Sequence, residues 1–111
     1  MAQIPITGAS GTLPTTAAAI YTLPPSQNTP YATIDNIFFT NTVDDQDFTI
    51  TLYQKAVGSS SAKVLWSFNF KGAKSVVDTD IKKLVFGDSI MAVCNRSTVQ
   101  YVVNGYYELS A

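Results

Sequence analysis

The sequence contains no histidine, a single cysteine and few charged residues. Charged residues make up only 14% of the chain, and seven Lys or Arg against eight Asp or Glu give a formal net charge of -1. No more than two basic residues are adjacent, which argues against a protein that follows nucleic-acid phosphates. Without histidine, general-base chemistry would have to come from carboxylates at turns. We therefore expect a protein with no catalytic residues, cofactor, metal ion or small-molecule substrate.

The lone cysteine excludes an intrachain disulfide. Residues 89–95 alternate in a way that puts Ile90, Ala92 and Cys94 on one face of a strand. A reactive thiol needs a nearby base or positive surroundings. We expect Cys94 to be a small buried hydrophobe and not a nucleophile.

Targeting and membrane signals are also missing from the sequence. The first residues lack the basic and apolar regions of a signal peptide, and no apolar run approaches the roughly 18 residues of a membrane helix. We expect a protein made in a cytoplasm, without export by the standard route and without a membrane partner.

What the sequence does contain is a series of short runs rich in β-branched and aromatic residues. Turn residues separate them every 8 to 12 residues or so, and no helical periodicity of about ten residues occurs. About seven or eight strands of this kind predict an all-β fold, an antiparallel two-sheet sandwich of jelly-roll or Ig-like type. We expect one domain over residues 18–111, preceded by an arm over residues 1–17.

Two long runs, at residues 31–42 and 48–55, predict a β-hairpin. The acidic segment at 44–47 lies between them and has no glycine of the kind that turns a calcium loop, so a solvated tip is expected. Within the first run, Ile34 and Phe38 are expected on one face. Ile37 and Phe39 are expected on the other, so this strand should be covered on both faces.

Residues 63–71 predict the most heavily buried face of the chain. They place Val64, Trp66, Phe68 and Phe70 at strict period two. Large aromatic side chains bury about 150–250 Å² each, so this run is expected to anchor the core.

A weaker, more polar run at residues 75–81 predicts an edge strand. Asp78 and Asp80 fall on one face at period two, a spacing that an acid/base pair could use. Because no histidine or apolar pocket accompanies them, we expect surface carboxylates. Residues 82–88 then end in a Gly-Asp turn.

The last segment, residues 98–111, leaves two alternatives. Asn104 and Gly105 form a strong signal for a tight hairpin turn. One long strand with Gly105 at a bulge is the other possibility. We favour the long strand, because a final strand over residues 106–109 would be very short.

Residues 1–17 mix glycine and proline with Thr, Ser and Ala, and they offer little apolar surface. They are expected to be either a flexible terminus or an arm that orders against a neighbouring subunit. For the second alternative, Ile4, Ile6 and Leu13 are the candidate assembly contacts. Deleting the arm is expected to weaken assembly and leave thermal stability nearly unchanged.

Five short phrases follow one another in a fixed order: Ile-Tyr-Thr-Leu-Pro at 20–24, Phe-Phe-Thr-Asn-Thr at 38–42, Phe-Thr-Ile-Thr-Leu-Tyr at 48–53, Phe-Gly-Asp-Ser-Ile at 86–90 and Val-Asn-Gly-Tyr at 103–106. In this order the chain resembles small β-sandwich structural proteins of tailed bacteriophage virions. Such proteins are capsid decoration or cement proteins and neck or tail components. The likeness covers roughly residues 20–109 and departs from the pattern at 63–71, a segment that is usually more polar.

The resemblance implies a virion protein that binds copies of itself and a major capsid, neck or tail protein. An alternative is a glycan- or receptor-binding module of a tail fibre or adhesin, in which exposed Trp66, Tyr31, Tyr53 or Tyr106 would stack on the ligand. The exposure of these rings separates the two hypotheses. A buried Trp66 favours the building block.

Overall fold

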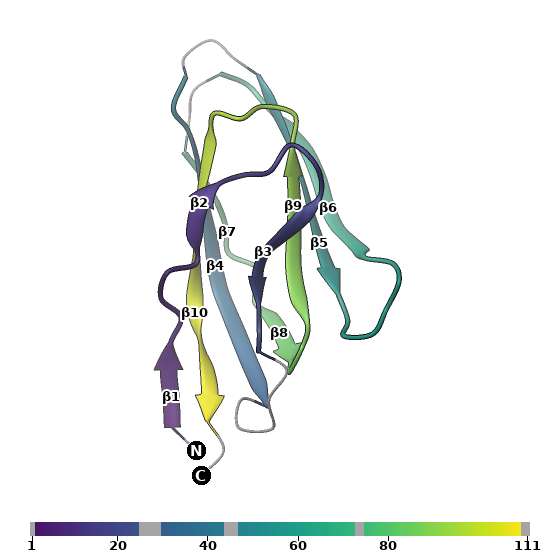
Figure 1. Ribbon diagram of the computed structural model, residues 1–111. Coiled ribbons are helices and arrows are strands. Elements are labelled where there is room, and N and C mark those ends of the chain that lie inside the picture. The colour runs from purple at the N-terminus through teal and green to yellow at the C-terminus, as the bar shows by residue number, and fades with distance from the viewer. Residues whose placement is uncertain (1, 25–29, 44–46, 73–74, 110–111) are drawn as a thin grey trace.

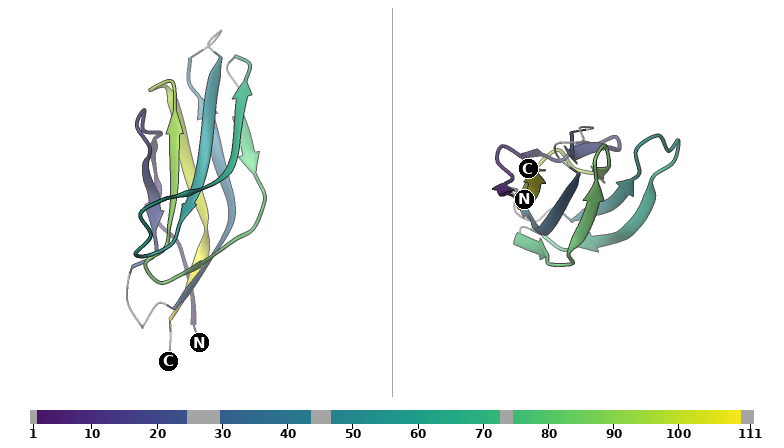
Figure 2. Two further views of the ribbon diagram at one scale, coloured as in Figure 1. Left: turned by 90° about the vertical axis from the view of Figure 1, so that its right-hand side faces the viewer. Right: turned by 90° about the horizontal axis from the view of Figure 1, so that it is seen from below.

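The computed structural model describes residues 2–24, 30–43, 47–72 and 75–109. Within these ranges two antiparallel β-sheets pack face to face, which confirms the predicted all-β two-sheet sandwich (Figure 1, Figure 2). The described residues form ten strands, more than the seven or eight expected. All their regular elements are strands, and no helix among them is long and apolar enough to cross a membrane.

The ten strands divide into a six-stranded sheet, called sheet A here, and a four-stranded sheet B. Sheet A contains β1 (Ala2–Pro5), β2 (Ser10–Thr12), β4 (Tyr31–Asn41), β7 (Ser75–Asp78), β8 (Lys82–Val85) and β10 (Val99–Leu109). Sheet B contains β3 (Ala18–Thr22), β5 (Phe48–Lys55), β6 (Lys63–Phe70) and β9 (Ser89–Cys94).

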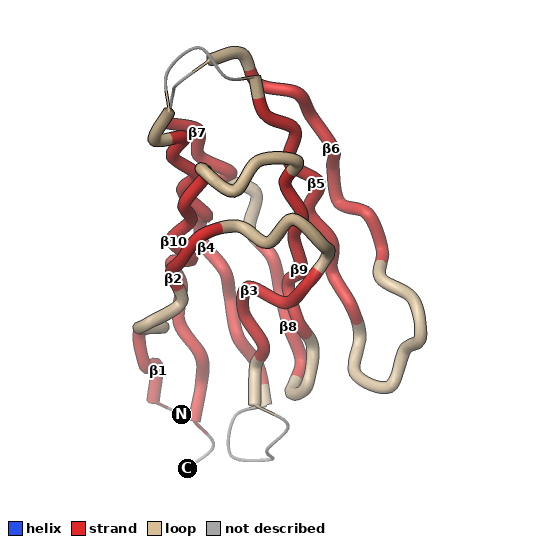
Figure 3. The backbone as a smooth tube through the Cα atoms, turned by 45° about the horizontal axis from the view of Figure 1, so that its top comes forward, coloured by secondary structure: helices blue, strands red, loops and turns tan. Residues whose placement is uncertain are grey.

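Sheet A has the strand order β1-β10-β4-β7, and sheet B has the order β3-β9-β5-β6. The short strands β1 and β2 both pair with β10, one after the other along its length. The short strands β7 and β8 pair with β4 in the same way (Figure 3). Counting each such pair as one interrupted strand, both sheets are four strands wide. This arrangement is a jelly roll, one of the two sandwich types that the sequence predicts.

The hydrophobic core lies between the two sheets, and sixteen buried apolar side chains of the described residues form it. Ile34, Ile37 and Phe39 of β4 supply one side. Alternate residues of β5 supply the other: Phe48, Ile50 and Leu52. The strict alternation of β5 in the sequence therefore predicts its buried face correctly.

The predicted hairpin between β4 and β5 is wrong, although both strands exist. β4 pairs with β10, β7 and β8, whereas β5 pairs with β6 and β9, so the two strands lie in different sheets. Residues 44–46, which lie between the two strands in the sequence, are outside the described part of the chain. Apolar alternation shows which face of a strand is buried but not which strand is its neighbour, because both sheets cover the same core.

The expectation that β4 is covered on both faces is also wrong. Ile34 lies on the buried face together with Ile37 and Phe39, while Phe38 is exposed on the outer face. A bulge changes the period of the strand between these residues. In the register with β10, Asn36 and Ile34 have partners and Asp35 is the extra residue.

The long terminal strand that the sequence favours is present as β10, with a register shift between Asn104 and Gly105. The predicted turn after β8 is present as well, with Gly87 at a φ of 87°. Cys94 is buried as expected, and burial raises the pKa of its thiol. These predictions are correct because each depends on local sequence alone.

Gly105 lies where β10 passes very close to β4. A Cβ atom there would overlap the carbonyl oxygen of Thr33 and stand 2.9 Å from the Cα atom of Ile34. Since neither backbone atom can move without disturbing the pairing, we expect Gly105→Ala to lower the free energy of unfolding by about 2–3 kcal/mol in urea titrations. Gly11→Ala is the control, because its Cβ would meet only the Tyr101 ring, at 3.6 Å. Equal losses in both variants would contradict the prediction.

Candidate functional site

The aromatic strand β6 lies at the free edge of sheet B, and β5 is its one partner among the strands that the structure describes. The prediction that it is the most heavily buried run is wrong, because none of its residues is buried. Trp66, Phe68 and Phe70 do lie on the core side of the sheet, since each pairs with a buried residue of β5. Sheet A leaves this side of the edge strand uncovered, so Phe68 is 62% exposed.

A second bulge removes Val64 from the aromatic face. Trp66 pairs with Leu52 and Val64 pairs with Tyr53, which leaves Leu65 as the extra residue of β6. Val64 consequently turns to the outer face of sheet B, where it is exposed. The regular part of the strand begins at Trp66.

The aromatic rings form a continuous series from the core to the surface. Trp66 meets Phe39 and Phe70 edge to face, with ring centroids 6.0 Å and 6.3 Å apart. Phe70 stacks on buried Phe48 at 5.3 Å and contacts Phe68 at 5.1 Å. The inner rings therefore hold the exposed Phe68 ring in place, and such aromatic pairs favour a fixed geometry.

A groove of about 380 Å³ lies beside these rings. Residues of β6 form one side of it, and Val76, Val77 and Asp78 of β7 line the other. β6 and β7 are edge strands of different sheets on the open side of the sandwich (Figure 2). The groove lies between them. Its lining is mainly apolar, and Asp78 and Asp80 are the two charged residues in it.

Asp78 is buried in an ion pair, contrary to the expectation of a surface carboxylate. Its side chain is 5% exposed and that of Lys82 is 6% exposed, with Nζ 2.8 Å from Oδ2. The Trp66 indole N–H also donates to Oδ2 at 2.8 Å, and the backbone N–H of Asp80 donates to Oδ1 at 2.9 Å. Lys82 donates a second hydrogen bond to the carbonyl of Asp80, at 2.7 Å. These bonds connect β6 to the β7–β8 connection across the open side.

The pKa of the Asp78 carboxyl lies below its usual range. Burial alone would raise this pKa, but the hydrogen bonds from Lys82, Trp66 and the Asp80 backbone together outweigh burial. A carboxyl with a lower pKa in the folded chain stabilises the fold above its unfolded pKa. That contribution is lost as the pH falls through the folded pKa.

We expect the free energy of unfolding to fall progressively below about pH 5, where Asp78 begins to bind a proton on unfolding. Urea unfolding between about pH 2 and pH 7 measures this dependence. The double variant Asp78→Leu/Lys82→Met removes both charges and should show a shallower decline over the same range. Identical slopes for this variant and the wild type would contradict the assignment.

The outer face of sheet A carries an apolar row that the sequence analysis missed. Val102 pairs with Phe38, and Phe38 pairs with Val77, so the three side chains stand next to one another on β10, β4 and β7. They are 44%, 45% and 45% exposed, in that order. Polar residues flank the row: Gln100, Thr40 and Ser75 on one side, and Asn104 and Asn36 on the other. An exposed apolar patch with a polar rim is typical of a protein-binding surface.

The predicted aromatic contacts do not come together at one site. Tyr31 is exposed, while Tyr53 and Tyr106 are partly buried. Tyr31 and Tyr106 lie on the outer face of sheet A, and Tyr53 lies on the outer face of sheet B. Trp66 is partly buried, and its indole N–H is bonded to Asp78. It is therefore not a free stacking platform.

The candidate assembly residues Ile4, Ile6 and Leu13 lie along the β10 edge of sheet A. Ile4 of β1 pairs with Tyr107 of β10, and the backbone N–H of Ile6 donates to the carbonyl of Gly105 at 2.9 Å. Leu13 is 2% exposed and belongs to the core. In this structure the segment is thus part of the sandwich, in contrast to the arm expected over residues 1–17.

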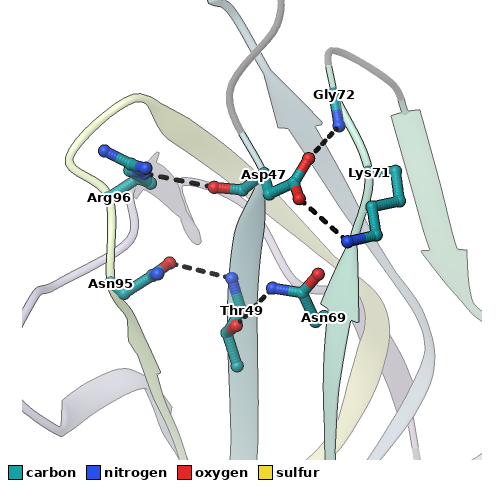
Figure 4. Close-up of polar contacts among 7 residues, drawn as sticks. All are labelled: Asp47, Thr49, Asn69, Lys71, Gly72, Asn95 and Arg96. Atoms are coloured by element: carbon teal, nitrogen blue, oxygen red, sulfur yellow. Dashed lines mark hydrogen bonds and ion pairs between the residues drawn. The ribbon is translucent and has the colours of Figure 1, made fainter.

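Polar contacts join three connections at one end of the sandwich (Figure 4). The Asp47 carboxylate accepts hydrogen bonds from Lys71 Nζ at 3.0 Å and from the backbone N–H of Gly72 at 3.2 Å. Its carbonyl accepts one from Arg96 Nε at 3.1 Å. The hydrogen bond from Lys71, followed by that from Gly72, lowers the pKa of Asp47. The other residues of the predicted tip, 44–46, lie outside the described ranges.

No protein-family model matches the chain, and no curated protein matches it. Among solved structures, the chain is similar to a pentameric capsid protein isolated from metagenomic phage sequences. Two crystal structures of that protein give 16% identity each and TM-scores of 0.48 and 0.47, over 91% and 90% of this chain. The chain spans 60% of the length of that capsid protein. It is also similar to a protein of the disulfide-linked pili of Bacillus endospore appendages, at 15% identity and a TM-score of 0.45, over 98% of this chain and 87% of that one.

Proposed function

We propose that this protein is a structural component of a bacteriophage virion, either a capsid decoration or cement protein or a neck or tail component. In this role it acts through contacts with other virion proteins and with copies of itself, and it catalyses no reaction. The proposal includes no nucleic-acid or membrane partner.

The apolar row on the outer face of sheet A is the observation that carries the proposal. β4 is apolar on both faces at this level, since Phe38 is exposed and its neighbours Ile37 and Phe39 are in the core. The outward row of three apolar side chains lies outside the core between the sheets. Their exposure in the free chain is explained if another protein covers them.

The strand order and the order of the sequence phrases also support a virion role, by analogy. Jelly rolls are common in viral capsid proteins, and the strand order here is a jelly roll. Because one fold serves many functions, this likeness adds support without identifying the partner. The order of the five sequence phrases is the second argument, and it supports tailed-phage virion proteins in particular.

Co-expression with the capsid, neck and tail genes of the same phage tests the proposal. Particles purified on a density gradient should contain this protein, detected by mass spectrometry. Phe38→Asp places a charge in the apolar row and should remove the protein from the particles without unfolding it. Thr22→Asp makes the same change in charge at an exposed position of sheet B and should leave incorporation unchanged.

Particles that never contain the protein would overturn the proposal. The glycan-binding alternative would gain support if the purified protein bound oligosaccharides on an array and lost this binding in Tyr31→Ala. Hydrolytic activity in the purified protein would exclude a purely structural role.

A further inference from the structure

The free edge of β6 differs from the other edges of the sandwich in the part of the chain that the structure describes. The edge of sheet A at β7 and β8 is interrupted and carries the inward charges Asp78 and Lys82. The opposite edge consists of two strands of four and three residues. The free edge of sheet B at β3 has five residues and a bulge after Ala19. Short strands, bulges and inward charges are the usual means of preventing edge-to-edge pairing.

β6 has none of this protection between Trp66 and Phe70. This five-residue segment contains no charge and no proline, and it pairs with β5 in unbroken register. Its outer edge therefore presents backbone N–H and C=O groups to which another strand can add. Three aromatic side chains project from the same segment beside the apolar groove.

We infer that β6 pairs antiparallel with β6 of a second copy of this chain, about a two-fold axis through Phe68. This rests on the proposed structural role, in which copies of the chain meet at high local concentration. The pairing joins sheet B of the two copies into one continuous sheet. Such a two-fold contact uses the same surface on both copies.

The register about Phe68 follows from the direction of the side chains. It sets Phe68 opposite its own symmetry mate and Trp66 opposite Phe70 of the partner subunit, and all of these rings lie on the core side of the sheet. Ser67 then lies opposite Asn69 of the partner subunit, on the outer face. Every pair thus joins residues of the same face, as antiparallel pairing requires.

Charge and face both disfavour the neighbouring register, centred on Ser67. It would set Lys63 opposite Lys71 of the partner subunit, and like charges directly opposite are destabilising. It would also pair Leu65, on the core side after the bulge, with the outward Asn69. A second copy suits this edge because its own segment from Trp66 to Phe70 is uncharged and aromatic, and an apolar edge strand requires such a partner.

Cysteine cross-linking tests the register directly. Residues directly opposite in an antiparallel pair have Cα atoms about 4.5–5.5 Å apart, within disulfide range. Under mild oxidation Phe68→Cys should therefore form a covalent dimer. Ser67→Cys alone and Asn69→Cys alone should not, whereas a mixture of the two should cross-link. Cys94 is buried and provides the background level in the wild type.

Light scattering over a range of concentrations gives the second measurement. A five-residue pairing belongs to the small class of interfaces, below about 1,200 Å² in total, so we expect a concentration-dependent dimer. Phe68→Lys should weaken it at least tenfold with little change in the melting temperature of the monomer. Val85→Lys, at an exposed apolar position of β8 in sheet A, is the matched control and should leave dimerisation unchanged.

The outcomes separate this inference from the proposed function. Self-association that persists in Phe68→Lys, without a Phe68→Cys cross-link, overturns β6 pairing and leaves the virion role standing. Cross-linking of Ser67→Cys alone as fast as Phe68→Cys overturns the register. A Phe68→Cys dimer in a protein that never enters particles supports the pairing and overturns the virion role.

Discussion

Replacing Asp78 with asparagine is expected to lower the free energy of unfolding by about 3–5 kcal/mol, because it leaves the buried Lys82 ammonium without its counter-charge. The amide keeps one acceptor oxygen, so its NH2 group faces either the donors from Trp66 and Lys82 or the backbone N–H of Asp80. A loss of this size would be a large part of the stability of a domain of 111 residues. Urea unfolding at pH 7 measures it.

The matched control removes the whole ion pair. Asp78→Leu/Lys82→Met replaces both charges with apolar groups of similar size, and such exchanges are often neutral or stabilising. The double variant should therefore be more stable than Asp78→Asn, although it also loses the bond from Trp66. A decrease in the free energy of unfolding of less than about 1 kcal/mol in Asp78→Asn would contradict this prediction. It would mean that water or another group compensates the Lys82 charge and that the ion pair does not hold the open side together.

The aromatic strand shows why burial is harder to predict than strand direction. Period two in residues 63–71 places Trp66, Phe68 and Phe70 on one face correctly. The amount of surface that they bury depends on whether the other sheet reaches over them. That depends on the position of β6 in its sheet, and contacts between residues distant in sequence determine this position. From the sequence alone, a central strand and an edge strand of the same composition cannot be told apart.

Bulges account for two of the errors within strands. The extra residues Asp35 in β4 and Leu65 in β6 shift the alternation by one position, so Ile34 joins the core face and Val64 leaves the aromatic face. A slip of one residue turns every following side chain to the other face. The irregularity predicted at Gly105 of β10 is this same bulge of the β4–β10 pair, and its extra residue belongs to β4. Nothing in the sequence of β4 marks Asp35 as the extra residue, and nothing in β6 marks Leu65.

The apolar row on the outer face of sheet A was missed because it depends on contacts between residues distant in sequence. Phe38, Val77 and Val102 come from three strands far apart in the chain, and only the register of sheet A brings them together. Alternation predicts polar residues at outward positions, so an apolar residue at each of these positions was unusual. Each strand has just one such residue in this row, and the sequence does not show that the three lie side by side. The local features, such as the turn at Gly87 and the buried Cys94, needed no such register and were predicted correctly.

Deleting residues 2–13 is expected to unfold the domain. From the sequence alone, deletion of the arm over residues 1–17 was expected to leave thermal stability nearly unchanged. The deletion removes β1 and β2, exposes the paired edge of β10 and takes buried Leu13 out of the core. It also removes the backbone hydrogen bonds that join Ile6, Ala9 and Leu13 to β10, at 2.8–2.9 Å. Together these losses should exceed about 5 kcal/mol, the lower end of domain stability. Circular dichroism with a thermal scan measures the outcome.

A point variant separates the contribution of the core from that of the strand pairing. Leu13→Ala leaves both short strands in place and should cost about 2–5 kcal/mol, because the side chain is fully enclosed and its removal leaves a cavity. Thr15→Ala changes an exposed neighbour and should shift stability by less than about 0.5 kcal/mol. A deleted chain that melts at the wild-type temperature would mean that the segment is not held by β10, and the free arm would again be the better description. A stable deletion together with weaker self-association would assign Ile4, Ile6 and Leu13 to assembly, as the sequence analysis expected.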